Sequence, residues 1–210
     1  MEAAKLAYSA AVIGLIFGPP GSGKGTQASR IQQEFEMTHL STGEILRKEV
    51  AKGSDIGTEA QRIMAAGDLV PDDLMDRIVQ ARLERTGSGV SVLLDGFPRT
   101  LVQAKALDAM ADRLGRKVAF VVALDVPEAA LVDRLLHRAQ VEGRADDTRE
   151  VIMERMQEYH RRTEPVLEHF RARGVPLVAI DGRGEVAELF ERLRDSLRRV
   201  LGRSPANTGL

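Results

Sequence analysis

The stretch FGPPGSGKGTQ, from Phe17 to Gln27, decides the fold of this chain. It nearly fits a phosphate-loop template, which is Gly, four residues, Gly-Lys and then Ser or Thr. Gly18, Gly23 and Lys24 match, but a second glycine follows the lysine and the hydroxyl comes one place late, at Thr26. The stretch is therefore either a glycine-rich turn without a ligand or a phosphate loop of a particular subclass.

The flanking sequence favours the phosphate loop. The apolar run AVIGLIF (11–17) predicts a buried strand before the loop, and a helical pattern over 24–35 follows it. In a strand–loop–helix unit, the loop amides and the helix N-terminus converge on one anion site. We expect Lys24 to contact the outer phosphates of a nucleoside triphosphate. Because residue 25 has no hydroxyl, Mg²⁺ is expected to be held mainly by the nucleotide's phosphates and by water.

Further apolar runs predict strands at 90–95 (VSVLLD), 118–126 (VAFVVALDV) and 175–180 (VPLVAI). Continuous apolar strands separated by helices are typical of a parallel sheet covered on both faces. We therefore expect an α/β fold, a doubly wound parallel sheet of about five strands. Helices are predicted over 24–35, 100–115, 127–138, 147–173 with a break near Pro165, and 185–201.

Two segments do not follow the strand–helix alternation. Residues 41–85 are predicted to be helical with no strong strand, and residues 139–147 are short and polar. We interpret both as excursions from one sheet domain, because 210 residues are somewhat short for two full domains.

The composition is that of an ordinary globular protein, with 43% apolar and 29% charged residues. A formal net charge of −1 gives no bulk attraction to nucleic acid or to anionic lipid. The chain has 24 arginines, most of them in helical patterns such as ERLRDSLRRV, which favours a solvated surface. There is no cysteine, no apolar run of membrane-spanning length and no signal-peptide pattern at the start, so a cytoplasmic protein is expected.

The stretch LLDGFPRT (93–100) ends the second strong strand. Ligands of doubly wound sheets bind beyond the carboxyl ends of the strands. Asp95 is placed there to orient metal-bound water, and the guanidinium of Arg99 is suited to hold a phosphate through two parallel hydrogen bonds. Taken alone, the stretch also fits a strand-ending aspartate followed by a surface arginine.

Several motifs together closely resemble the adenylate kinases, within the nucleoside monophosphate kinase family. They are GPPGSGKGTQ, LSTGEILR, GDLVPDD, DGFPRTLVQA, and RLLHRAQVEGRADD leading to ERMQEYHRRTEP, in the family's order from about residue 12 to 200. The Gly-Lys-Gly-Thr ending of the loop is the form that this family uses. The resemblance implies reversible transfer of the terminal phosphoryl group of ATP to AMP, giving two ADP.

The resemblance also implies a role for individual residues. ATP would be bound by Gly21, Ser22, Gly23, Lys24, Gly25, Thr26, Arg134, Arg138 and Gly184. AMP would be bound by Thr42, Arg47, Asp68, Leu69, Val70, Gly96, Phe97, Pro98, Arg99, Gln103, Arg144 and Arg155. The catalytic set would be Lys24, Arg99, Arg138, Arg144 and Arg155. Mg²⁺ would accompany ATP and be oriented by Asp95 through water with no direct protein ligand, and no zinc is expected.

The implied organisation is a single P-loop kinase domain over 11–210. Its core would comprise 11–40, 71–137 and 148–203, with a helical NMP-binding insertion at 41–70 and a lid of the short type at 138–147. The implied partners are ATP, AMP and ADP, without nucleic acid or membrane, and the implied state is a monomer.

Two other functions remain as alternatives. In a UMP/CMP kinase, Thr42 and Gln103 tend to be replaced, so their presence favours AMP. A non-catalytic nucleotide-binding module would not need so many cationic side chains.

The roles of several other residues stay open. Asp146 and Asp147 are either a helix cap or lid residues near the metal-bound water, and His137 fits a solvated helix surface. His39, His160 and His169 lie in no motif and receive no role.

Overall fold

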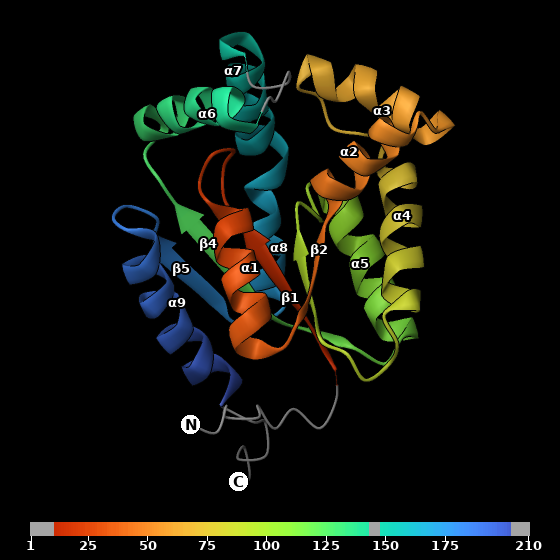
Figure 1. Ribbon diagram of the computed structural model, residues 1–210. Coiled ribbons are helices and arrows are strands. Elements are labelled where there is room, and N and C mark those ends of the chain that lie inside the picture. Colours follow the sequence, from red (N-terminus) through yellow and green to blue (C-terminus); the bar gives the residue numbers. More distant parts are fainter. Residues whose placement is uncertain (1–10, 143–147, 203–210) are drawn as a thin grey trace, which may run out of the picture.

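The fold is a five-stranded parallel sheet covered by helices (Figure 1), and the computed structural model describes residues 11–142 and 148–202. The strands are β1 (Val12–Phe17), β2 (Thr38–Ser41), β3 (Val92–Asp95), β4 (Lys117–Asp125) and β5 (Leu177–Asp181). Their order in the sheet is β2-β3-β1-β4-β5, and every neighbouring pair is parallel. The predicted α/β class with about five parallel strands is confirmed.

One or more helices follow each strand along the chain. They are α1 (Lys24–Phe35), α2 (Thr42–Lys52), α3 (Asp55–Ala66), α4 (Asp72–Arg85), α5 (Leu101–Arg113), α6 (Glu128–Glu142), α7 (Arg149–Glu158), α8 (Pro165–Ala172) and α9 (Val186–Leu201). A π-helical turn, η1 (Tyr159–Thr163), joins α7 to α8. None of the helices in the described part of the chain has the length and apolar composition needed to cross a bilayer.

Alternate residues of β1 face opposite layers of helices, as the two-residue period of a strand requires. Ile13 and Leu15 belong to a buried cluster that includes residues of α4, α5 and α8. Val12 and Ile16 belong to a second cluster that is formed with α1 and α9. The central strand is therefore buried on both faces, which is why its sequence is a continuous apolar run.

Two elements differ markedly from the sequence-based predictions, and the predicted break in a third is found. Strand β2 was missed, and it lies at the edge of the sheet with all its residues only partly buried. Helix α6 continues to Glu142, whereas the predicted helix ended at Arg138. The predicted helix over 147–173 does break near Pro165, and the π-helical turn η1 comes directly before that break.

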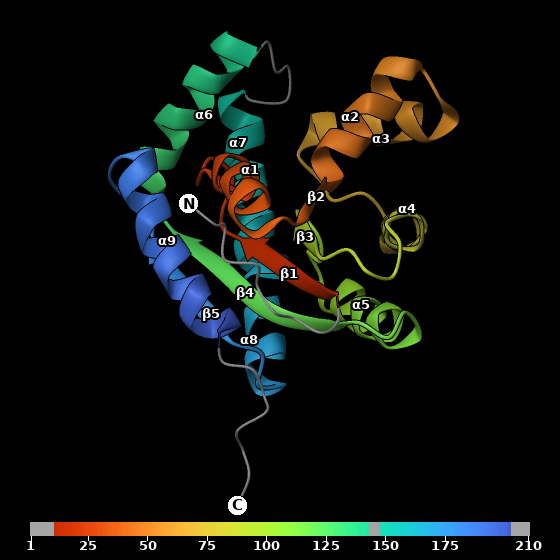
Figure 2. The same cartoon turned by 60° about the horizontal axis from the view of Figure 1, so that its bottom comes forward.

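Two pairs of helices stand beyond the carboxyl ends of the strands. Helices α2 and α3 rise on one side of the sheet, and α6 and α7 rise on the other (Figures 1 and 2). Between them, the glycine loop connects β1 to α1. This arrangement puts the end of the sheet where ligands of α/β folds bind between two helical arms.

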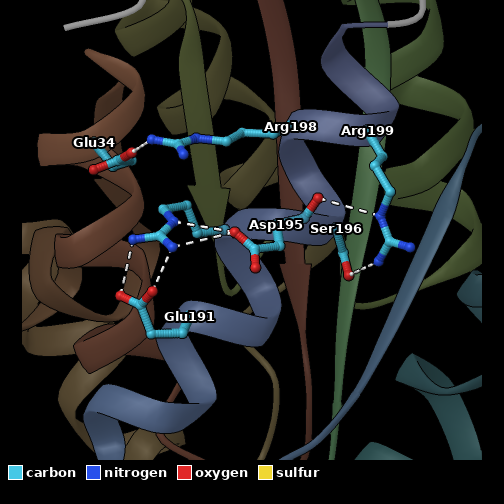
Figure 3. A network of polar contacts seen from close by, with 7 residues as sticks. Glu34, Glu191, Asp195, Ser196, Arg198 and Arg199 are labelled. Atoms are coloured by element: carbon cyan, nitrogen blue, oxygen red, sulfur yellow. Dashed lines mark hydrogen bonds and ion pairs between the residues drawn. The ribbon is translucent and has the colours of Figure 1, made fainter.

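The arginines of α9 confirm the interpretation of the ERLRDSLRRV segment as a solvated surface. Arg198 forms an ion pair with Glu34 of α1, and Arg199 donates to the hydroxyl of Ser196 one turn earlier in its own helix (Figure 3). Both arginines are exposed. Contacts of this kind contribute at most about 1 kcal/mol each, so α9 is held mainly by its apolar face.

The packing of Gly14 in β1 gives a test of the core. A Cβ atom on Gly14 would lie 2.2 Å from Cζ of Phe120, a ring that is fully buried. We expect Gly14→Ala to lower the free energy of unfolding by about 1–3 kcal/mol because the core becomes overpacked. Denaturant titration measures this change.

A matched control is Gly89→Ala, because a Cβ atom at Gly89 would meet none of the described residues within 4 Å. Adding Phe120→Leu to Gly14→Ala removes part of the clashing ring and should recover much of the lost stability. Equal stability of Gly14→Ala and the wild type would contradict this account of the packing.

Candidate functional site

The glycine loop has the backbone conformation that a phosphate loop requires. Gly23 precedes the first residue of α1 and has φ 89° and ψ 15°, a left-handed backbone conformation that residues other than glycine rarely adopt. No described residue lies within 4 Å of the position that a Cβ atom on Gly23 would occupy. The first amides of α1 have no partner within the helix and carry the positive end of its dipole, so this end of α1 favours an anion.

Lys24 begins α1, and its ammonium folds back over the loop. Nζ donates to the carbonyl oxygens of Gly18 at 2.6 Å and Pro19 at 2.9 Å. Loss of solvation lowers the pKa of Lys24 to about 7, since the attraction of the Asp95 carboxylate is opposed by nearby arginines such as Arg99. At neutral pH, Lys24 is therefore divided between its ammonium form and its neutral amine form.

Asp95 ends β3 beside the glycine loop and is almost fully buried. Burial alone would raise the pKa of its carboxyl group, but the hydrogen bond from His39 and the charges of Lys24 and Arg99 lower that pKa below its usual value. Nε2 of His39, on the neighbouring strand β2, lies 3.3 Å from Oδ2 of Asp95. Asp95 is thus an ionised carboxylate at the floor of the site.

Arg99 is held in place from three directions. Its Nε donates to the carbonyl oxygen of Gly96 at 2.8 Å, which fixes the plane of the guanidinium group. Its backbone N–H donates to Oε1 of Gln103, and its carbonyl oxygen accepts from Thr163 in η1. Burial, followed by the charge of Arg155, lowers the pKa of Arg99 to about 10, so the side chain stays cationic at neutral pH.

Gly96 makes this arrangement possible. It has φ 80°, and a Cβ atom on it would lie 2.7 Å from Oγ1 of Thr42 and 2.8 Å from Nη2 of Arg99. The hydroxyl of Thr42 donates to the carbonyl oxygen of Gly96 at 2.9 Å. The absence of a side chain at residue 96 lets a threonine and an arginine approach the end of β3 together.

These groups line a cavity of about 720 Å³ between the glycine loop and the two helical arms. Its cationic side chains are Lys24, Arg47, Arg99, Arg134, Arg138 and Arg155. Its acidic side chains are Glu44, Asp95 and Glu158. Six basic side chains, five of them arginines, against three acidic ones in one concave space favour a ligand with several negative charges.

A smaller cavity of about 70 Å³ lies beside the first. Thr42 and Gln103 supply polar groups to its wall, and Met64, Val70 and Met75 supply apolar surface. Arg47, Arg99 and Arg155 line both cavities. The boundary between the two cavities therefore carries three arginines, next to a pocket suited to a flat apolar ring with a polar edge.

The described structure brings most of the predicted site residues to these two cavities. The larger one is lined by Gly21, Gly23, Lys24, Gly25, Thr26, Leu69, Gly96, Phe97, Pro98, Arg134 and Arg138, and the smaller one also by Asp68, Leu69 and Val70. Ser22 and Gly184 line neither, since Ser22 is a buried residue of the loop and Gly184 lies in the turn before α9. Arg144, Asp146 and Asp147 lie outside the described residues.

Sequence reasoning missed two residues that contact the predicted site. His39 received no role, yet its imidazole is bonded to Asp95; it lies on β2, the strand that was not predicted. Asp72, at the start of α4, accepts a hydrogen bond from Gln103, and only its place in the GDLVPDD motif marked it. His137, interpreted as a surface residue, is exposed but also lines the larger cavity.

The oxygen groups at the loop suit a magnesium ion that retains its water. Within residues 11–142 and 148–202, no three His, Asp or Glu side chains are grouped to hold a metal directly. The ionised Asp95 carboxylate and the hydroxyl of Thr26 both line the larger cavity beside the loop. These groups fit a hydrated Mg²⁺ carried by phosphates, because Mg²⁺ gives up its water reluctantly.

Comparison with known proteins gives the family of this chain. The sequence profile described as adenylate kinase matches residues 16–175. The chain belongs to the adenylate kinase family. It is 45% identical to an adenylate kinase of Micrococcus luteus over 186 residues, which are 89% of this chain and 90% of that protein. Adenylate kinases of Thermus thermophilus and Xanthomonas oryzae pv. oryzae are 46% and 45% identical, over 87% and 88% of this chain and 95% and 98% of theirs.

Membership of the adenylate kinase family confirms the resemblance that the motifs indicated. The protein is therefore a nucleotide-binding phosphotransferase, an adenylate kinase in which the loop ending Gly-Lys-Gly-Thr follows β1. Because the matched range runs from β1 to the segment before β5, it contains every residue that lines the two cavities.

Proposed function

We propose that this adenylate kinase transfers the terminal phosphoryl group of ATP to AMP, reversibly, with ATP in the larger cavity and AMP reaching into the smaller one. The observation that carries this assignment is the shared boundary of the two cavities, lined by Arg47, Arg99 and Arg155. Two anionic nucleotides that meet at such a boundary bring their phosphates together against positive charge.

On the ATP side, the backbone amides of residues 21–26 would surround the phosphates, with Lys24 against the outer ones. Arg134 and Arg138 lie four residues apart on α6 and line the same cavity, so they would contact ATP phosphates from the opposite arm. Arg134 also donates to the carbonyl oxygen of Gly182 at 3.5 Å, which links α6 to the turn where the ATP base is proposed to contact Gly184.

On the AMP side, Arg47 and Arg99 would bind the phosphate while Thr42 and Gln103 contact the base. The backbone of residues 68–70 would line the base pocket, which agrees with their place on the smaller cavity. Arg155, at the boundary, would contact the phosphoryl group in transfer. Arg144 is proposed for the same task from its motif alone, because it lies outside the described residues.

The chemistry needs no protein nucleophile. Phosphoryl transfer proceeds through a loose transition state with charge spread over the equatorial oxygens, so catalysis consists of positioning and electrostatic stabilisation. Lys24, Arg99 and Arg155 offset the repulsion between the two nucleotides and hold them in line. Bound Mg²⁺ would neutralise charge on the phosphates of ATP, with Asp95 orienting its water.

Water must be kept from the transferring group, or the enzyme would hydrolyse ATP. We propose that the insertion 41–70 closes over AMP and the lid 138–147 over ATP, on a core of 11–40, 71–137 and 148–203. In support, the insertion already approaches the opposite arm, since a Cβ atom on Gly67 would lie 3.4 Å from Cγ of Arg155.

We also propose that the enzyme acts as a monomer in the cytoplasm, without nucleic acid or membrane partners. Light scattering tests the monomeric state, and cell fractionation tests the location.

A coupled assay that compares AMP, CMP, UMP and GMP as phosphoryl acceptors tests the proposed substrate. We expect AMP to be preferred, because Thr42 and Gln103 supply hydrogen-bonding groups to the base pocket. A preference for CMP or UMP would instead support a pyrimidine monophosphate kinase. Nucleotide affinity without turnover of any acceptor would support a non-catalytic binding module.

Proton uptake on ATP binding tests the environment of Lys24. Its pKa of about 7 leaves most of the lysine neutral at pH 8, where the phosphates of ATP are already ionised. Bound phosphates favour the ammonium form and raise that pKa, so binding should take up close to one proton at pH 8. Calorimetry in two buffers of different ionisation enthalpy measures the uptake.

For the same reason, the affinity for Mg–ATP should fall as the pH rises above 7. Lys24→Met should abolish the uptake, whereas Lys52→Met, which changes an exposed lysine on α2, should retain it. Uptake that persists in Lys24→Met would show that another group is responsible.

A further inference from the structure

Asp72, the first residue of α4, forms a hydrogen-bonded contact with the start of α5. Oδ1 of Asp72 accepts from Nε2 of Gln103 at 2.8 Å and from the hydroxyl of Thr100 at 3.1 Å. The same hydroxyl accepts from the backbone N–H of Gln103 at 3.1 Å. The side chain of Gln103 is thus tied to α4 at its nitrogen end.

The oxygen end of the Gln103 amide has its own partner. Oε1 accepts from the backbone N–H of Arg99 at 2.7 Å. A carboxylate oxygen can only accept and a backbone N–H can only donate, so these two partners together determine which end of the amide is oxygen and which is nitrogen. If the amide turned over, its NH₂ group would face the backbone N–H of Arg99 and its oxygen would face the carboxylate of Asp72. Because Gln103 is only 1% exposed, water could not satisfy these groups instead.

Gln103 keeps hydrogen-bonding capacity for a ligand after these contacts. The NH₂ group has a second hydrogen and the carbonyl oxygen a second lone pair, and the side chain lines the smaller cavity. An amide that offers one acceptor and one donor in a fixed order complements the adenine edge, in which the 6-amino group donates and N1 accepts. A 6-oxopurine has the reverse order, because O6 accepts and N1–H donates.

We propose that Asp72 is a specificity-positioning residue that holds the Gln103 amide in the order that accepts adenine and rejects 6-oxopurines. This inference rests on the proposed function, in which Gln103 contacts the base of AMP. The purine ring cannot turn over to present its donor and acceptor in the opposite order, since Arg47 and Arg99 are proposed to hold the phosphate of the same nucleotide. Without the Asp72 carboxylate, only the backbone N–H of Arg99 still selects this orientation, so the amide turns over at a lower cost and meets the 6-oxopurine edge more readily.

The test is Asp72→Asn, a change of nearly the same shape. An asparagine can offer Gln103 either its oxygen or its NH₂ group, so it no longer selects one orientation of the amide. The acceptors to compare are AMP and IMP, which differ only in the exchanged groups at this edge. We expect the preference for AMP over IMP, as a ratio of kcat/KM values, to fall at least ~10-fold, because discrimination then loses the penalty for unpaired polar groups. The KM for ATP should stay within about twofold.

The matched control is Asp73→Asn. Asp73 is the next residue in the same helix turn, is exposed, and lies 3.8 Å from Arg77. It undergoes the same change of charge at the same helix end but has no contact with Gln103, so the preference for AMP should stay at the wild-type value. A second comparison uses Gln103→Ala with and without Asp72→Asn; in that background Asp72→Asn should have no further effect on the ratio.

The ratio is measured on one protein sample with two substrates, so partial unfolding of a variant changes both rates equally and leaves the ratio intact. If Asp72→Asn keeps the wild-type preference while the wild type forms ADP from ATP and AMP, the role of Asp72 is overturned and the proposed function stands. If the wild type forms no ADP, the proposed function itself fails. An effect of Asp72→Asn that persists in Gln103→Ala would also overturn the proposal, because Asp72 would then act by another route.

Discussion

Lys24→Met is expected to lower kcat/KM for phosphoryl transfer by at least ~10²-fold, a loss of about 2.7 kcal/mol of transition-state stabilisation. Methionine keeps the unbranched side chain as far as Cε but removes the ammonium group that lies over the glycine loop, where Nζ contacts the carbonyl oxygens of Gly18 and Pro19. The fold should persist, because charging this lysine inside the site is itself unfavourable, as its lowered pKa indicates. Steady-state kinetics and thermal melting together measure the effect.

The matched control is Lys52→Met. Lys52 is exposed on α2 and forms only an exposed ion pair with Glu49, so its loss should leave kcat/KM near the wild-type value. Activity of Lys24→Met within a few-fold of the wild type would refute the role assigned to Lys24.

Arg99→Ala should have an effect of the same size, again at least ~10²-fold in kcat/KM. The guanidinium group lies at the boundary of the two cavities and is held by the carbonyl oxygen of Gly96. Its removal takes away a positioned pair of donors where the phosphates of the two nucleotides are proposed to meet. Arg99→Lys should recover little of this activity, since an ammonium cannot make the same pair of parallel hydrogen bonds.

Arg113→Ala is the control for the loss of an arginine. Arg113 ends α5, is exposed, and donates to Oε1 of Gln80 at a distance from both cavities. It should retain wild-type kinetics. If Arg99→Ala and Arg113→Ala behaved alike, the proposed convergence of charge on two nucleotides would lose its main support.

The central part of the fold could be predicted because its residues are buried on both faces. The runs that became β1, β3 and β4 are continuous and apolar, and α1 has the bounds predicted from the loop and the helical pattern. Strand β2 could not be predicted in the same way. Its four residues, THLS, are partly buried and include one aliphatic residue, so the strand is formed by pairing with β3 rather than by its own pattern.

The site was predictable where motifs carry it and unpredictable where contacts are long-range. Lys24, Asp95 and Arg99 lie in motifs at the ends of two strands, and they do line one cavity. The contact between His39 and Asp95 joins residues 56 positions apart, and that between Asp72 and Gln103 joins residues 31 positions apart. No local pattern encodes such pairs, because they depend on how β2 and α4 pack against the rest of the protein.

The extent of α6 shows a second limit of prediction from the sequence, which concerns where a helix ends. The predicted end at Arg138 was taken from the change to a polar sequence, yet the helix continues to Glu142. A polar residue such as Gln140 is acceptable there, because the packed face of α6 is formed by Leu131 and Leu135 in its first two turns and does not extend to the end of the helix.

The central claim is that the loop and the arginines bring two nucleotides together so that a phosphoryl group passes between them without water. Phosphorus NMR on the purified protein with Mg²⁺, ATP and AMP tests it directly, because every phosphorus species is followed at once. Two ADP should form for each ATP and AMP consumed, with no inorganic phosphate released. No ADP from folded protein, or phosphate released as fast as ADP is formed, would contradict it.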